Sequence, residues 1–150
     1  MVADLEVIRR TLPELVRATQ HALEVYQAYL ADPRARVWLA EIEPGRAPVG
    51  YLVVAPARLP LPDLDDNDVE VKRIYLLHRV QGTGLGRRLM SDAVDYARQT
   101  GSRRVLLGVY GGNERAIAFY ERFGFTRVGT RRFRVGHNDY DDLILGLNIG

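Results

Sequence analysis

The most informative part of the sequence is Gln81-Gly82-Thr83-Gly84-Leu85-Gly86-Arg87-Arg88, which lies between two stretches of different periodicity. The stretch before it, Val69–Leu77, has the composition of a β-strand, and Leu85–Gln99 after it carries apolar residues at the spacing of an amphipathic helix. Closely spaced glycines at a strand-to-helix turn let the backbone approach a ligand and point successive N–H groups at it. Because the helix N-terminus adds partial positive charge, the turn predicts an anion site, most naturally for phosphate.

The same turn differs from two common phosphate-binding loops. A Walker loop ends in Lys-Ser/Thr, but the chain's one lysine is Lys72, outside the turn. A dinucleotide fingerprint with glycines at 82 and 84 needs a third glycine at 87, where Arg87 stands. Arg87 and Arg88 add fixed positive charge that suits an anion. The alternative is a flexible strand-to-helix turn without a ligand.

Outward from this turn, the sequence predicts a mixed α/β sheet. Arg104–Tyr110 is a short apolar run typical of a strand covered on both faces. The resulting strand–helix–strand unit implies a parallel pair with a right-handed crossover, and flanking hairpins imply antiparallel edges. The other expected elements are a helical stretch over Ala3–Ala31 broken near Pro13, strands over Arg36–Glu43 and Val49–Ala55, a loop over Pro56–Asp68, a helix capped by Asn113 and ended by Gly124, and strands over Phe125–Val135 and Tyr140–Ile149.

The composition narrows the class of protein. With 150 residues, 47% hydrophobic and 27% charged, the chain predicts one folded domain rather than a disordered or membrane-spanning protein. It contains no cysteine, which excludes disulfides and thiolate nucleophiles and favours a cytoplasmic location. The N-terminus has no apolar core of a signal peptide. A net charge of +2, with acids and bases interleaved, gives no indication of a nucleic-acid partner.

Two motifs resemble those of the GCN5-related N-acetyltransferase (GNAT) family. Gln81-x-x-Gly84-x-Gly86 after a strand is similar to the family's Q/R-x-x-G-x-G/A signature, and Asn113–Phe125 is similar to its N-x-x-A-x-x-F-Y-x-x-x-G-F. The resemblance covers Glu70–Ile149 clearly and the N-terminal third only in element order, with no obvious first strand. It implies one N-acetyltransferase domain over residues 1–150. Its fold would be a mostly antiparallel sheet with a central splayed parallel strand pair and helices on both faces.

By this resemblance the cosubstrate is acetyl-CoA. Its pyrophosphate would lie on the N–H groups of residues 82–87, its pantetheine would pair like an extra strand with residues 74–76, and Asn113 would contact the pantetheine amides. The alternative for Asn113 is a helix cap, which is compatible with that role. No metal is expected, because the three histidines are scattered, and His78 near the turn is better explained as an exposed residue. The residues assigned to the cofactor are Ile74, Tyr75, Leu76, Gln81, Gly82, Thr83, Gly84, Leu85, Gly86, Arg87, Asn113 and Phe119.

Two residues are candidates for catalysis. Without cysteine, the acetyl group would pass directly from CoA to a bound amine, which must lose a proton while the departing thiolate gains one. Tyr120 occupies the family's acid position, and a phenol with a pKa near ~10 can protonate a thiolate; its alternative is a core tyrosine. Glu70 lies eleven residues before Gln81, where the histone acetyltransferase branch has its catalytic glutamate. Its alternative is a solvated residue or a partner of Lys72.

The acceptor is expected to be a small cationic amine or polyamine. Two acidic groups could line an acceptor mouth and attract a cation, although acidic loops are usually solvated turns. Val69–Gly86 and Thr130–Leu145 are similar to PaiA-type acetyltransferases of polyamines, but three nearby arginines could repel such a substrate. The alternatives are a protein lysine or N-terminus, or a CoA-binding regulatory protein, and the last strands could pair in a homodimer. The acidic groups are Asp63, Asp65, Asp66, Asp68 and Glu70, then Asp139, Asp141 and Asp142; the arginines are Arg131, Arg132 and Arg134.

Overall fold

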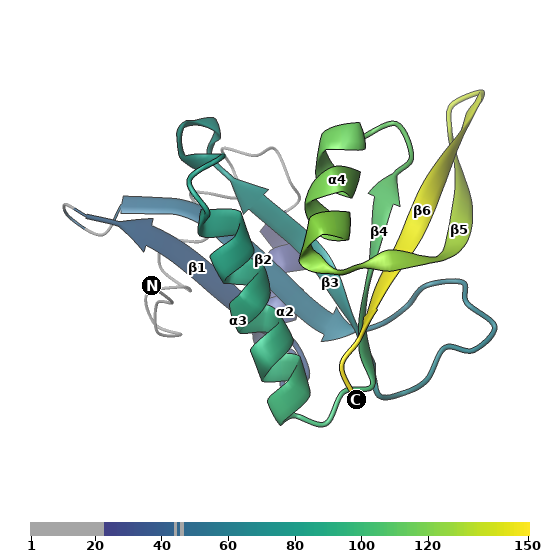
Figure 1. Ribbon diagram of the computed structural model, residues 1–150, viewed down its shortest axis with the longest axis horizontal. Coiled ribbons are helices and arrows are strands. Elements are labelled where there is room, and N and C mark those ends of the chain that lie inside the picture. Colours follow the sequence, from purple (N-terminus) through teal and green to yellow (C-terminus); the bar gives the residue numbers. More distant parts are fainter. Residues whose placement is uncertain (1–22, 44, 46) are drawn as a thin grey trace. The chain divides into compact units, whose positions relative to one another are not determined.

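The computed structural model describes residues 23–43, 45 and 47–150, and this part of the chain contains three α-helices and six strands (Figure 1). The described chain divides into two compact units. The first runs up to Ala55 and includes Val71–Asp95, and the second consists of Pro56–Glu70 and Tyr96–Gly150. The break near Pro13 and the family's first strand fall outside the described residues.

The first unit is built on an antiparallel hairpin. Its elements are α2 (Leu23–Ala31), β1 (Arg36–Ile42), β2 (Ala47–Pro56), β3 (Asp68–Leu76) from Val71 onward, the short 3-10 helix η1 (His78–Val80), and α3 (Leu85–Gln99) up to Asp95. β1 pairs with β2 as predicted, with one irregularity between Ala40 and Glu41. Five successive residues of β1 are buried, so apolar side chains cover both of its faces. The core cluster contains Val37, Leu39, Tyr51 and Val53, with Tyr29, Leu30, Tyr75 and Leu77 packed against it.

The second unit contains the predicted parallel pair. Asp68–Glu70, at the start of β3, pair in parallel with Arg104–Leu106 of β4 (Arg104–Tyr110). The remaining elements are α4 (Glu114–Phe123), β5 (Thr126–Val135) and β6 (Asn138–Asn148). β6 lies between β4 and β5 and is antiparallel to both (Figure 1), and the ladder order is β1-β2-β3-β4-β6-β5. The prediction of a mixed, mostly antiparallel sheet is confirmed.

The segment between β2 and β3 covers one face of the second unit. Leu59 packs with Leu106 and Ile144 in a buried cluster, and Ala57 and Leu61 pack against it. A Cβ atom at Gly129 would lie only 2.6 Å from Leu61, so a residue with a side chain would displace this cover. The loop predicted over Pro56–Asp68 is therefore packed against the sheet through its apolar residues.

Candidate active site

The glycine turn lies in the first unit and joins η1 to α3. Val80 and Gln81 donate their backbone N–H groups to the carbonyls of Leu77 and His78, at 3.0 and 3.1 Å, which forms η1. The Gln81 side chain donates to the Leu76 carbonyl at 3.2 Å, and the Thr83 hydroxyl donates to the Val80 carbonyl. These side chains hold the entry to the turn. Gln81, predicted as a cofactor residue, thus has a structural contact of its own.

The turn itself presents backbone donors. Gly82 and Gly84 have φ angles of +80° and +88°, which favour glycine, and a Cβ atom at either would meet no atom within 4 Å. Arg88 donates to the Gly84 carbonyl at 3.1 Å, as the first turn of α3 requires. Within the described residues, the N–H groups of residues 82–86 find no backbone acceptor. The turn therefore combines open space, unpaired N–H groups and a helix N-terminus.

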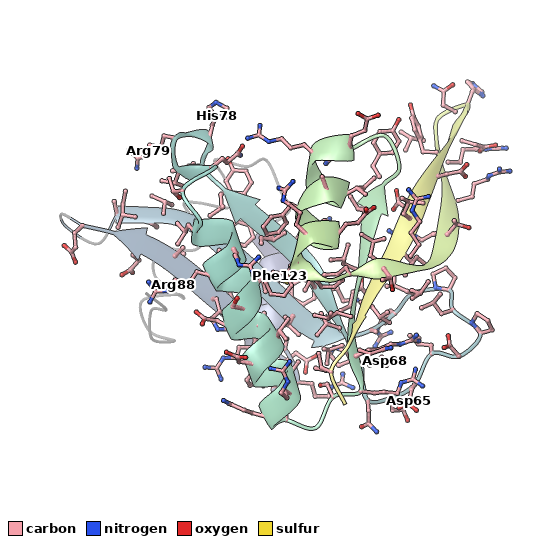
Figure 2. The ribbon with its side chains drawn as sticks, in the orientation of Figure 1. Asp65, Asp68, His78, Arg79, Arg88 and Phe123 are labelled. Carbon is pink, nitrogen blue, oxygen red and sulfur yellow. The ribbon has the colours of Figure 1, made fainter. Side chains whose placement is uncertain are left out.

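Exposed side chains, most of them arginines, flank this turn. Figure 2 shows His78 and Arg79 on η1 and Arg88 on the first turn of α3, all directed away from the ribbon. Each of them is exposed, as is Arg87. The expectation that His78 is an exposed turn residue is confirmed. Ile74, Tyr75 and Leu76, which precede the turn on β3, are half-buried.

In the second unit, α4 has the ends that its sequence predicted. Asn113 accepts a hydrogen bond from the Ala116 N–H on its Oδ1 atom at 3.2 Å, and Gly124 ends the helix with a φ angle of +122°. Asn113 is thus a helix cap, while its side-chain NH₂ group is a donor that the cap does not use. Its contact with pantetheine remains a prediction.

Tyr120 is enclosed by aromatic rings. Only 9% of the residue is exposed, and its ring lies 5.4 Å from that of Phe119 and 5.9 Å from that of Phe125, centroid to centroid, both edge to face. Burial raises the pKa of Tyr120 to about 12. No group in the described part of the chain pairs with its hydroxyl. The expected pKa near ~10 is therefore corrected upward, and the Tyr120 hydroxyl is protonated at neutral pH. Its role as the acid stays a prediction.

Glu70 is buried rather than solvated. It accepts a hydrogen bond on Oε1 from the Arg58 backbone N–H at 3.0 Å, and its register partner is Leu106. The segment that covers the sheet therefore also holds the carboxylate. The predicted alternation along β3 ends here: Asp68 and Glu70 are buried, but so is Val71.

The first acidic group forms a structural ion-pair cluster. Asp68 accepts from Arg103 Nη2 at 2.8 Å, from Arg104 Nη2 at 3.1 Å and from the Asp65 N–H at 2.9 Å; Arg104 also donates to Asp63 at 3.2 Å. Figure 2 shows Asp65 and Asp68 near one end of the second unit's strands. Burial alone would raise the pKa of Asp68, but the hydrogen bonds from Arg103 and Arg104 outweigh it and hold that pKa below its usual value.

The second acidic group is paired as well. Across the β5–β6 hairpin, three arginines each bind one aspartate, at 2.6, 3.1 and 2.9 Å, because they are register partners. Five of the eight acidic side chains in the two groups therefore bind arginines and are less available to a cationic acceptor than expected. Attraction of such an acceptor by these groups, and its repulsion by the arginines, stay predictions. Each of these three arginines has one carboxylate partner. The pairs are Arg131–Asp142, Arg132–Asp141 and Arg134–Asp139.

Comparison with known proteins identifies the family. The model of the acetyltransferase (GNAT) family matches residues 5–125. The chain belongs to this family. An uncharacterised N-acetyltransferase of Mycobacterium tuberculosis H37Rv is 38% identical over 120 residues, which cover 80% of this chain and 71% of the relative. The N-alpha-acetyltransferase RimI of the same organism is 40% identical over 74 residues, 48% of this chain and 45% of the relative.

Solved structures agree on the fold of this GNAT enzyme. The N-acetyltransferase of Staphylococcus aureus Mu50 superimposes with a TM-score of 0.75 at 17% identity, over 100% of this chain and 97% of that one. Among the residues that the structure describes, no helix is long and apolar enough to cross a membrane. No group of three or more metal-ligating side chains gathers in the same part of the chain. The enzyme is an N-acetyltransferase of the GNAT family.

Proposed function

We propose that this GNAT enzyme binds the acetyl-CoA pyrophosphate on the amides of residues 82–87 and transfers the acetyl group directly to a primary amine. The observation that supports the proposal is that the N–H groups of residues 82–86, at the N-terminus of α3, have no backbone acceptor among the described residues. Pantetheine then runs along residues 74–76, and Asn113 and Phe119 complete the cofactor contacts. A Cβ atom at Gly82 or Gly84 would meet no atom within 4 Å, so the backbone at these positions is open to a ligand.

The chemistry needs two proton movements. Glu70 takes a proton from the acceptor ammonium, and the free amine attacks the thioester carbonyl to form a tetrahedral intermediate. The C–S bond then breaks, and the CoA thiolate leaves with its negative charge on sulfur. The Tyr120 hydroxyl donates a hydrogen bond to that sulfur and supplies the proton that makes the free thiol. The new amide nitrogen loses its extra proton to solvent, and a proton from solvent restores the Tyr120 phenol.

The pKa of Tyr120 refines this step. A phenol with a pKa of about 12 is fully protonated at neutral pH, so every enzyme molecule carries the donor. Complete transfer to a thiolate whose acid has a pKa near ~8.5 is uphill by roughly 3 to 4 pKa units. Tyr120 therefore acts chiefly by hydrogen bonding to the developing thiolate, and the proton moves as the product thiol forms.

The acceptor that we propose is a primary amine of a small molecule. Five of the eight acidic side chains that would attract a polyamine bind arginines, which favours an amine of lower positive charge. The second candidate is a protein N-terminus, which the likeness to RimI favours. A CoA-release assay with polyamines, monoamines, amino acids and N-terminal peptides tests the proposal. The absence of acetylated product from every amine, with acetyl-CoA bound, would contradict it.

The glycine turn gives the first prediction. Gly84→Ala raises the KM for acetyl-CoA about tenfold, because a φ angle of +88° costs an alanine roughly 1–2 kcal/mol and its relaxation redirects the turn's N–H groups. Gly101→Ala is the matched control: Gly101 has a φ angle of +80° and equally open surroundings, but follows α3. We expect both variants to lose similar stability, but only Gly84→Ala to bind CoA more weakly. Calorimetric titration with CoA measures this affinity. Equal affinity in both variants would exclude the turn as the pyrophosphate site.

Glu70 gives the second prediction. Glu70→Gln keeps an acceptor for the Arg58 N–H but removes the base, so kcat/KM at neutral pH falls about 10²-fold. The rate of the variant then rises with pH towards the amine's own pKa, near ~10.4, because the substrate must arrive deprotonated. The measurement is the pH profile of kcat/KM. A variant with the wild-type profile would show that Glu70 is not the base.

A further inference from the structure

The register of the second unit places a group of polar and aromatic residues on the same sheet face as Glu70. Glu70 pairs with Leu106, and Gly108 follows two residues later on β4. Gly108 pairs with Ile144, Tyr110 pairs with Asp142, and Asp142 pairs with Arg131. Directly paired residues, and residues two apart on one strand, share a face. One face therefore carries Glu70, Gly108, Tyr110, Asp142 and Arg131. On the same face Leu59 of the covering segment packs on Leu106 and Ile144, and its Cδ2 atom lies 3.8 Å from the Cβ position of Gly108.

Arg131 occupies the space that Gly108 leaves open. A Cβ atom at position 108 would lie 2.9 Å from Nη2 of Arg131, so the guanidinium reaches across β6 and lies on the β4 backbone. The same Nη2 donates to Asp142 at 2.6 Å, and the Asp142 side chain is 10% exposed. The buried carboxylate fixes the guanidinium at this place. With 38% of its side chain exposed, Arg131 keeps further N–H donors for another partner.

Two tyrosine rings border this pair. Tyr110 is half exposed, and its ring lies 6.0 Å from that of Tyr140, edge to face. Tyr140 is two residues before Asp142 on β6 and shares its face. We name the surface formed by Gly108, Tyr110, Arg131, Tyr140 and Asp142 the arginine floor. By strand spacing, the Cα atoms of Gly108 and Glu70 are on the order of 8 Å apart.

We propose that the arginine floor selects an acceptor amine that also carries a carboxylate, with Arg131 as its specificity-determining residue. This inference rests on the proposed function, since Glu70 takes the proton of the same acceptor. A separation on the order of 8 Å between the base and the floor suits an amine and a carboxylate a few bonds apart, as in amino acids. The tyrosine rings offer an apolar surface for the acceptor's side chain.

The charge distribution selects an anion over a cation on this floor. Asp142 is buried and already binds Arg131, so its carboxylate is not available to an ammonium group. The guanidinium presents a planar fork that matches a carboxylate in two parallel hydrogen bonds. Arg132, the next residue, pairs with the exposed Asp141 and projects from the opposite face, with 71% of its side chain exposed. Arg132 therefore serves as the matched control.

The test compares acceptors that differ by one carboxylate. We expect the wild-type enzyme to acetylate tyrosine with a kcat/KM at least tenfold above that for tyramine. Arg131→Gln lowers kcat/KM for tyrosine about 10- to 100-fold through KM, the range for hydrogen bonds to a charged group, and changes tyramine less than twofold. Arg132→Gln leaves both acceptors unchanged. A preference for tyramine or spermidine in the wild type, or an equal loss for both acceptors in Arg131→Gln, overturns the inference.

A second measurement separates this inference from the reaction itself. Because Arg131→Gln leaves the buried Asp142 carboxylate without its cation, the double variant Arg131→Gln/Asp142→Asn provides a neutral pair if the single variant unfolds. Calorimetric titration of 3-phenylpropionate, which has a carboxylate but no amine, into the CoA complex tests the floor without turnover. Binding by the wild type and its loss in the double variant support the floor even if no amine is acetylated, an outcome that contradicts the proposed function alone. Equal binding by both proteins rejects the floor.

Discussion

Tyr120→Phe is expected to lower kcat about 10²-fold while the KM for acetyl-CoA changes little. The substitution removes one oxygen atom from a side chain that is buried among Phe119 and Phe125, so the aromatic contacts remain. No partner in the described part of the chain loses a hydrogen bond. The loss therefore falls on the departing thiolate, and removal of one acid–base group typically costs ~10²–10⁴ in rate. Single-turnover measurement of acetyl transfer, with Tyr96→Phe as control, gives the value.

The pH dependence of this effect has a defined sign. Because the folded-state pKa of Tyr120 is about 12 and the ordinary value is 10.0, the hydroxyl stays protonated in the native enzyme where a free tyrosine ionises. The ratio of wild-type to variant kcat should therefore stay constant through pH 10 and narrow only towards pH 12. The folded state binds the extra proton, so this group's contribution to stability is complete below pH 10 and is lost as the pH rises towards 12. Full kcat in Tyr120→Phe would remove Tyr120 from the mechanism.

The ends of the elements around the glycine turn were predictable because local residues determine them. α3, β4 and α4 have the predicted bounds, and the other described strands differ by at most two residues at an end. Gly101, Asn113 and Gly124 act through their own φ angles or side chains, within a few residues of the helix ends that they fix. Such signals need no tertiary information. Motif positions on these elements could be placed for the same reason.

The ion pairs could not be predicted from such local signals, except for those of the β5–β6 hairpin. The three Arg–Asp pairs of the β5–β6 hairpin are symmetric about the turn at residues 136 and 137, so an assumed hairpin register would have matched them. By contrast, Asp68 binds arginines 35 and 36 positions away. These contacts depend on the parallel register of β3 with β4, which makes Asp68 the partner of Arg104. The hydrogen bond from the Arg58 N–H to Glu70 likewise depends on how the covering segment folds back on the sheet, which local sequence does not indicate.

The second large effect concerns stability. Asp68→Ala is expected to lower the free energy of unfolding by about 3 kcal/mol, because it leaves the buried Arg104 guanidinium, with 8% of its side chain exposed, short of a carboxylate. The Nε atom of Arg104 already lacks a hydrogen-bond partner among the described residues, so few contacts remain to offset the burial of its charge. Its contact with Asp63 persists and places the loss at the lower end of the range for broken buried pairs. Urea unfolding followed by circular dichroism gives the difference.

The matched control lies two positions away. Asp66 is exposed in the same segment, so Asp66→Ala should change the free energy of unfolding by less than about 0.5 kcal/mol. The difference between wild type and Asp68→Ala should also depend on pH. The pKa of Asp68 lies below its ordinary value of 3.8, so its contribution is complete well above pH 3.8 and is lost as the pH falls through the lowered pKa. Similar losses in both variants at pH 7 would show that the segment, and not the ion pair, is responsible.

A double substitution separates the cost of an orphaned charge from the value of the pair. Asp68→Leu with Arg104→Met replaces two buried charges by apolar side chains of similar size, and such exchanges are often neutral or stabilising. Recovery of most of the lost stability would mean that Arg104, once unpaired, causes the loss. Because Asp68 also accepts from the Asp65 N–H and its carbonyl from the Ala57 N–H, the covering segment should still loosen. Arg58, the residue after Ala57 in this segment, donates its backbone N–H to Glu70. Because a loosened segment no longer holds the proposed base in place, kcat/KM should stay low even in a double variant that is folded and stable.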